Sequence, residues 1–72
     1  MKYPVGTTYF KRRGKEVVKH TVIDYYTTKN MARRIVKSRY VTAHELMGQL
    51  LIDYDVTQTE IDKAKFLETL PL

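Results

Sequence analysis

The chain has 72 residues, no cysteine and a net charge of +5, from 13 Lys and Arg against 8 Asp and Glu. The absence of cysteine excludes disulfides, thiolate metal sites and a cysteine nucleophile. Residues 1–72 are expected to form a single small domain, and the core of such a domain rarely supplies more than about 3–5 kcal/mol. Additional support from a homo-oligomer or a bound partner chain is therefore favoured.

The N-terminal sequence, Met-Lys-Tyr-Pro-Val-Gly, lacks the apolar core of a signal peptide. The longest aliphatic run, Leu-Leu-Ile at residues 50–52, is far too short to span a bilayer. These features predict a soluble cytoplasmic protein without a membrane partner.

The positive charge is concentrated in the first half of the chain. Residues 1–39 hold eleven Lys and Arg but two acids, a net charge of +9, whereas residues 40–72 have a net charge of −4. A basic segment within so short a chain favours an anionic partner, such as nucleic acid or an acidic protein surface. The sequence therefore predicts a basic face, provided that folding does not mix the two halves into an evenly charged exterior.

The N-terminal half predicts three strands. Residues 7–11 alternate β-branched, aromatic and polar side chains, and a polar, Gly-containing turn follows at residues 12–15. Residues 16–28 are rich in Val, Ile, Tyr and Thr, with apolar side chains on both parities, which is typical of a long strand that bends. After a turn at Lys29-Asn30, residues 34–43 predict a third strand.

Residues 42–54 are compatible with two structures. As a β-hairpin, Gly48 lies in the turn and every second residue from Leu50 onward shares one face of a return strand. As a helix, Thr42 is an N-cap with Glu45 three residues later, and an apolar stripe follows. Periodicity alone leaves both structures open.

The C-terminal segment carries a helix-start signal. Thr57 and Glu60 have the spacing of a capping box, with apolar residues at the two staple positions around it. This predicts a short helix or 3₁₀ turn over about residues 58–65. The apolar residues that follow do not continue its stripe, so residues 66–72 are expected to form an irregular or frayed tail.

Residues 39–61 contain the string Arg-Tyr-Val-Thr-x-His-Glu-x-Met-Gly-Gln-x-x-x-Asp-Tyr-Asp-Val-x-x-Thr-x-Ile. It resembles a group of small proteins, most without an assigned activity, that are encoded by phages and prophages. Residues 5–7 and 21–24 extend the resemblance over residues 5–61. In that group positions 50–52 are often Thr and Val, so the resemblance favours the strand at residues 42–54, although the three aliphatic residues here depart from that habit. The resemblance implies an origin but supplies no activity and no site residue.

With the hairpin, the chain is predicted to be mainly β, similar to a small SH3-like antiparallel barrel. Four or five strands in meander order would be followed by one short C-terminal helix or 3₁₀ turn. The alternative is an α+β fold in which residues 42–54 and 57–65 form two helices, resembling a helix-turn-helix with an attached sheet. We take the barrel as the prediction.

The sequence gives no support for an enzyme, a cofactor or a metal site. His20 and His44 are the only imidazoles, lack metal-binding spacing and are expected to be surface or turn residues. Asp53 and Asp55 would share a strand face, about 7 Å apart at Cα. Such a pair can perform acid–base chemistry or hold Mg²⁺. Without a nucleophile or a cleft, however, we expect them to keep an edge strand soluble.

Two basic segments with tyrosines nearby are the best candidate site. Both turns are expected to project from the same end or face of the barrel, where cations contact phosphates and aromatic rings stack on bases. The candidate nucleic-acid-binding residues are Lys11, Arg12, Arg13, Lys15, Lys29, Arg33, Arg34, Lys37, Arg39, Tyr9, Tyr25 and Tyr40.

Two functions follow from this surface. The first is a nucleic-acid-binding module, largely independent of base sequence. The alternative is a protein-binding accessory factor or inhibitor, in which the positive segments dock on an acidic surface of a host enzyme. A phage origin would place either function in the host cytoplasm.

Overall fold

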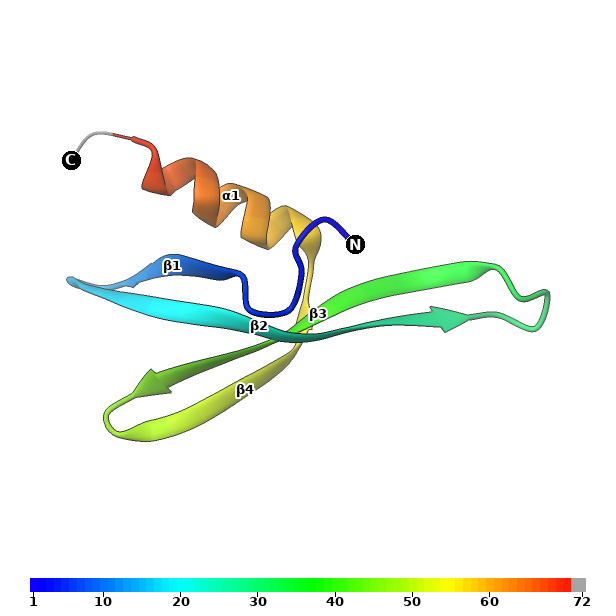
Figure 1. Cartoon of the computed structure of the whole chain (residues 1–72), viewed down its shortest axis with the longest axis horizontal. Helices are drawn as coiled ribbons and strands as arrows, with labels where there is room; N and C mark the ends of the chain where they lie inside the picture. The colour runs from blue at the N-terminus through cyan, green and yellow to red at the C-terminus, as the bar shows by residue number, and fades with distance from the viewer. Residues whose placement is uncertain (71–72) are drawn as a thin grey trace.

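The computed structural model of the chain describes residues 1–70 and shows one antiparallel sheet with a C-terminal helix (Figure 1). Its elements are β1 (Thr8–Arg13), β2 (Glu16–Lys29), β3 (Ile35–Leu46), β4 (Gln49–Val56) and α1 (Gln58–Glu68). Each strand pairs with the next, in the order β1-β2-β3-β4. The predicted mainly-β class, meander order and short helix are therefore confirmed.

The sheet is not closed, so the structure does not show the predicted barrel. Within residues 1–70, β1 and β4 lie at opposite edges and do not pair with each other. The sheet bends instead, since the pairing register shifts between Val22 and Asp24 on β2 and between Tyr40 and Thr42 on β3. Irregular pairing of this kind increases twist locally. The bend predicted for β2 is thus present. It directs the hairpins on either side of it apart and does not close the sheet into a barrel.

Residues 42–54 belong to the β3–β4 hairpin, so the helical alternative for this stretch is wrong. Met47 and Gly48 form the turn with φ values of 52° and 79°. Two successive positive φ values are typical of a type I′ turn, whose twist matches that of the strands it joins. Gly48 is therefore the residue that permits the hairpin.

Helix α1 begins as its sequence predicts. The Thr57 hydroxyl accepts the Glu60 N–H at 3.2 Å. The helix continues to Glu68, so the tail expected from residue 66 is helical at first. Glu68 Oε1 also accepts the Phe10 N–H at 2.6 Å, which joins the last helical turn to β1. Residues 71–72, where fraying is predicted, lie outside the described residues. In the described part of the chain, no helix has the length and apolarity needed to cross a membrane.

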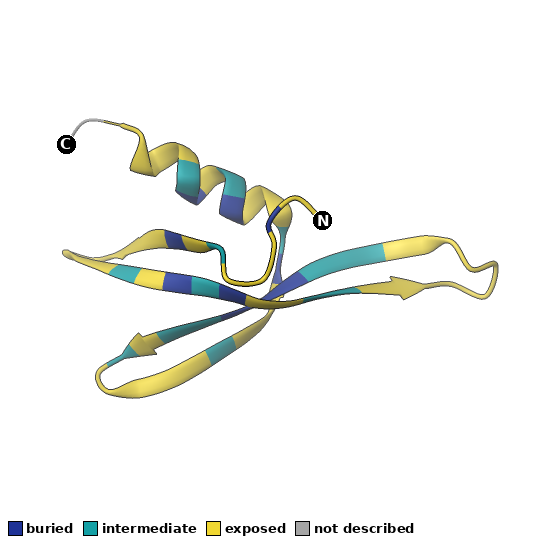
Figure 2. Ribbon diagram, in the orientation of Figure 1, coloured by how far each residue is buried: buried dark blue, intermediate teal, exposed yellow. Residues whose placement is uncertain are grey.

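The core lies between α1, the N-terminal segment and the sheet, and Figure 2 shows buried positions on α1 and on the strands. The helix contributes Ile61 and Ala64, three residues apart and so on one helical face. The Tyr40 hydroxyl accepts the N–H groups of Lys2 and Tyr3 at 3.0 and 3.1 Å, holding the N-terminal segment against the core. The core cluster is Tyr3, Tyr9, Val22, Tyr40, Val56, Ile61 and Ala64.

Candidate nucleic-acid interface

A two-stranded ribbon projects from the core at the right of Figure 1. We call residues 26–39 the arm. It begins at the pair of Tyr26 with Arg39 and ends in the loop between β2 and β3. Because β4 ends at Val56, opposite Tyr40, no third strand of the described chain pairs with the arm. The arm lies along the longest dimension of the molecule, 46 Å.

The arm carries five Lys and Arg and no acid. Lys29, Arg33 and Arg34 lie at its tip, are exposed and form no ion pair within residues 1–70. Lys37 and Arg39 lie nearer the core and are half-buried. The free positive charge is therefore concentrated at the tip.

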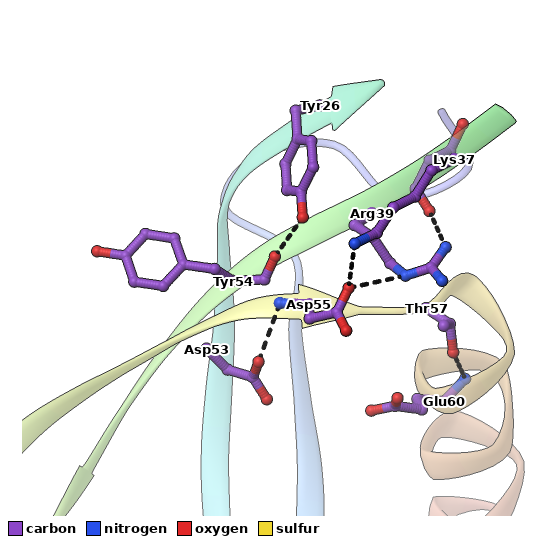
Figure 3. A network of polar contacts seen from close by, with 9 residues as sticks. Tyr26, Lys37, Arg39, Asp53, Tyr54, Asp55, Thr57 and Glu60 are labelled. Atoms are coloured by element: carbon purple, nitrogen blue, oxygen red, sulfur yellow. Dashed lines mark hydrogen bonds and ion pairs between the residues drawn. The ribbon is translucent and has the colours of Figure 1, made fainter. Parts of the chain in front are cut away.

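Asp55 of β4 neutralises part of the positive charge at the core end of the arm (Figure 3). Its Oδ1 accepts from Lys37 Nζ at 3.1 Å and from Arg39 Nε at 3.0 Å. The hydrogen bond from Lys37 is the largest factor that lowers the pKa of the Asp55 carboxyl below its ordinary value. The Asp55 N–H in turn donates to Asp53 Oδ1 at 3.0 Å. Sequence reasoning assigned Asp55 to edge protection and missed its role as the counter-charge of two candidate residues.

The tip is held in one conformation by Asn30. Its Oδ1 accepts the N–H groups of Ala32 and Arg34, each at 3.0 Å. Its backbone carbonyl accepts the Arg33 N–H at 2.9 Å, and its N–H donates to the Arg34 carbonyl at 3.0 Å. Arg33 has a φ of 60°, and the Met31 side chain is fully exposed. Asn30 and Met31 were not among the predicted site residues. The feature of the sequence that could have indicated them is their position between two groups of basic residues.

The second basic segment lies far from the arm tip. Lys11, Arg12, Arg13 and Lys15 are exposed around the β1–β2 turn, at the opposite end of β2 from the β2–β3 loop (Figure 1). The expectation that both turns project from one end is wrong. The reason is the length of β2, whose 14 residues span about 40 Å at the usual strand rise. The two segments are thus separate surfaces.

The tyrosines predicted to stack on bases are largely part of the core. Tyr9 and Tyr40 are 2% and 1% exposed, so their ring faces are closed to a base and both predictions are wrong. Tyr25 is half-buried, with its ring centroid 4.8 Å from that of Tyr40. Tyr26, outside the predicted set, donates its hydroxyl proton to the Tyr54 carbonyl at 2.7 Å (Figure 3). The arm tip therefore carries cations but no aromatic ring.

The two histidines meet across β2 and β3. Their ring centroids are 4.2 Å apart, and the His20 ring stacks on Tyr9 at 5.2 Å. His20 is only 9% exposed, so the expected surface position is wrong for this residue. Burial is the main cause that lowers the pKa of His20 to about 4, and the neighbouring His44 and Lys11 act in the same direction.

Acid is expected to destabilise the fold through His20. Its pKa is about 4 in the folded protein, against an ordinary value of about 6.5 in an unfolded chain. Between these values the unfolded chain binds more protons, so stability is present above pH 6.5 and is lost as the pH falls toward 4. His44, Lys11 and Asp53 also act electrostatically on the pKa of His20: His44 and Lys11 lower it, and Asp53 raises it. The free energy of unfolding should decrease by up to about 3 kcal/mol from pH 7 to pH 4.

Urea denaturation at several pH values measures this effect. His20→Phe keeps a ring against Tyr9 and should remove most of the dependence above pH 4. The carboxyls of Asp55 and Asp62, whose pKa values are lowered, contribute mainly below that range. An unchanged midpoint between pH 7 and pH 4 in the wild-type protein would contradict the prediction.

An open groove of about 720 Å³ lies between α1 and the β1–β2 hairpin. Exposed apolar side chains on both sides line it, and its charged border is mixed: the cations Lys11, Arg12 and Lys63 and the acids Glu60 and Glu68. The apolar residues are Phe10, Val17, Leu67 and Leu70.

The described chain thus presents two exterior features that could receive a partner: the basic arm and the apolar groove. No family model, curated protein or solved structure matches this chain.

Proposed function

We propose that the chain is a nucleic-acid-binding module that contacts phosphates through the arm, largely independently of base sequence. The observation that carries this proposal is the charge of the arm: five cations without an acid, on a ribbon with no third strand beside it in the described residues. Cations that contact phosphates release condensed counterions, and this release supplies most of the affinity of non-specific binding.

The solvent exposure of the arm supports the proposal that a partner binds to it. An isolated two-stranded hairpin is marginally stable in water. Here the ribbon also exposes Ile35 by 60% and Val36 by 62%, besides Met31 at the tip. A nucleic-acid groove would cover part of this apolar surface while its phosphates neutralise the cations.

The salt dependence of binding tests the proposal. A fluorescence-polarisation titration of a labelled DNA oligonucleotide should give a linear decrease of log K with log salt concentration. Three to five engaged cations predict a slope of about −3 to −4.5. Binding that is absent at low salt, or that does not change with salt, would contradict the proposal.

Asp55→Asn is expected to strengthen binding. The substitution frees Lys37 and Arg39 from their shared carboxylate. The affinity should rise several-fold and the salt slope should steepen by up to about 2, since two more cations become available. Stability should change little because Asp55 is exposed and solvent screens its ion pairs.

Glu45→Gln is the matched control, since it removes the same charge from an exposed position near the β3–β4 turn. Equal gains in affinity for both variants would show that net charge alone matters and would argue against release of the two arm cations.

The resemblance to phage and prophage proteins supports a phage origin for the chain. A phage protein that binds nucleic acid would act in the cytoplasm of the host. This part of the proposal rests on the resemblance at residues 5–7, 21–24 and 39–61 and does not depend on the charge of the arm.

The apolar groove favours a second candidate function, an accessory factor that docks on a host protein. Its exposed apolar side chains suit the apolar face of an amphipathic segment of the partner. In a pull-down from nuclease-treated host lysate, the wild-type chain should retain one stoichiometric protein that Leu67→Asp does not. Leu67 is 52% exposed, so this variant is expected to fold. Equal retention by both chains would argue against docking in the groove.

A further inference from the structure

We infer that the arm binds in the major groove of duplex DNA, an inference that rests on the proposed function and specifies its substrate. The first argument is shape. Two paired strands lie about 4.8 Å apart and, with side chains, fill the roughly 12 Å width of the B-DNA major groove. The minor groove, about 6 Å wide, is too narrow for a ribbon without deformation. The major groove of an RNA duplex is deep and narrow, so side chains cannot reach its bases.

The second argument is the kind of side chain that the arm presents. Single-stranded nucleic acids are bound by cations combined with aromatic rings that stack on unpaired bases. The tip has no ring to offer, since the one aromatic residue of the arm, Tyr26, lies at its core end, is half-buried and donates its hydroxyl proton to the Tyr54 carbonyl. Hydroxyls and cations dominate instead, and both are donors to phosphates and to base edges of a duplex. The exposed groups of this kind are Thr27, Thr28, Lys29, Arg33 and Arg34, whereas Lys37, Ser38 and Arg39 are half-buried.

The third argument is the conformation of the tip. Arg33 occupies a left-handed conformation, φ 60°, in which glycine would be unstrained. Four hydrogen bonds involving Asn30 hold this turn, so the backbone from which the Arg33 side chain projects is already ordered before binding. Preorganisation of this kind reduces the entropic cost of association. Beside Arg33, the exposed Met31 offers an apolar surface suited to the thymine methyl group, which lies in the major groove.

Three labelled probes of one mixed sequence test the inference: a DNA duplex, an RNA duplex and a DNA single strand. At low salt the DNA duplex should bind at least about tenfold more tightly than either of the others. Methyl green, a major-groove ligand, should displace the protein from the DNA duplex, and the minor-groove ligand distamycin should not. Equal or tighter binding of the RNA duplex or the single strand, or displacement by distamycin alone, would overturn the groove assignment and leave the proposed function standing. Failure of all three probes to bind would overturn both.

A pair of glycine substitutions tests the role of the tip. Arg33→Gly retains a residue that tolerates the positive φ but removes the side chain, and should weaken duplex binding about five- to tenfold. Met47→Gly is the matched control: Met47 also has a positive φ, 52°, is 98% exposed, and lies in the β3–β4 turn. It should leave binding unchanged. Thermal denaturation should show that neither variant is less stable than the wild-type protein. Equal affinity of Arg33→Gly and the wild-type protein would overturn the role of Arg33 in the groove.

Discussion

Replacement of Lys29, Arg33 and Arg34 by alanine is expected to weaken DNA binding by about 100-fold at roughly 0.1 M salt. These three cations lie at the exposed tip and have no ion-pair partner within residues 1–70. Each phosphate contact contributes about 0.9 to the salt slope, so the slope should become shallower by close to 3. Polarisation titrations at several salt concentrations measure both quantities. Far-UV circular dichroism should be unchanged, because the three side chains pack against nothing in the core.

The chain contains its own control for this experiment. Arg12, Arg13 and Lys15 are also exposed and lie at the other end of β2, and their replacement by alanine removes the same charge. Both triple variants have a net charge of +2 instead of +5. The control should lose less than about fivefold in affinity, since distant exposed charges are screened by salt. Equal losses in the two variants would mean that binding follows net charge and that the arm is not the interface.

Tyr40→Ala is expected to unfold the domain. The Tyr40 ring is 1% exposed and packs against Tyr3 and Tyr25, with ring centroids 5.9 and 4.8 Å away. Truncation of a buried aromatic side chain costs about 3–5 kcal/mol. A core of this size supplies about the same amount in total. Circular dichroism of this variant should therefore lack the signal of the folded wild-type protein.

Tyr40→Phe measures the contribution of the hydroxyl to stability separately from that of the ring. It keeps the packing but leaves the N–H groups of Lys2 and Tyr3 without their acceptor. The Tyr3 contact is buried, so a loss of about 1–3 kcal/mol is expected in urea denaturation. Tyr54→Phe is the control, since Tyr54 is 65% exposed, and it should change stability by less than about 0.5 kcal/mol. An unchanged midpoint for Tyr40→Phe would show that the hydroxyl does not hold the N-terminal segment.

The local elements of the fold could be predicted because their causes lie within a few residues. Thr57 and Glu60 satisfy the start of a helix three residues apart, and Gly48 permits the positive φ of a two-residue turn. The β-branched and aromatic residues of β2 predict a long strand, and the tip cations are visible as a run without acids. The first three strands, the helix start and the most exposed part of the candidate site were therefore accessible from the residues themselves, whereas residues 42–54 suited a helix as well as a hairpin and only the resemblance favoured the strand.

The remaining features depend on contacts between residues far apart in the chain. The alternation of side chains along a strand shows which residues lie on the same face of the sheet as Tyr9 or Tyr40. Only the packing of α1 shows that this face forms the core. The 14 residues of β2 separate the two basic turns only because they form one continuous strand. Asp55 neutralises Arg39 from 16 residues away, across the β3–β4 hairpin. Strand composition and turn chemistry thus determined which elements form, whereas sheet closure, burial and charge pairing were decided in three dimensions, because each depends on which distant surfaces come into contact.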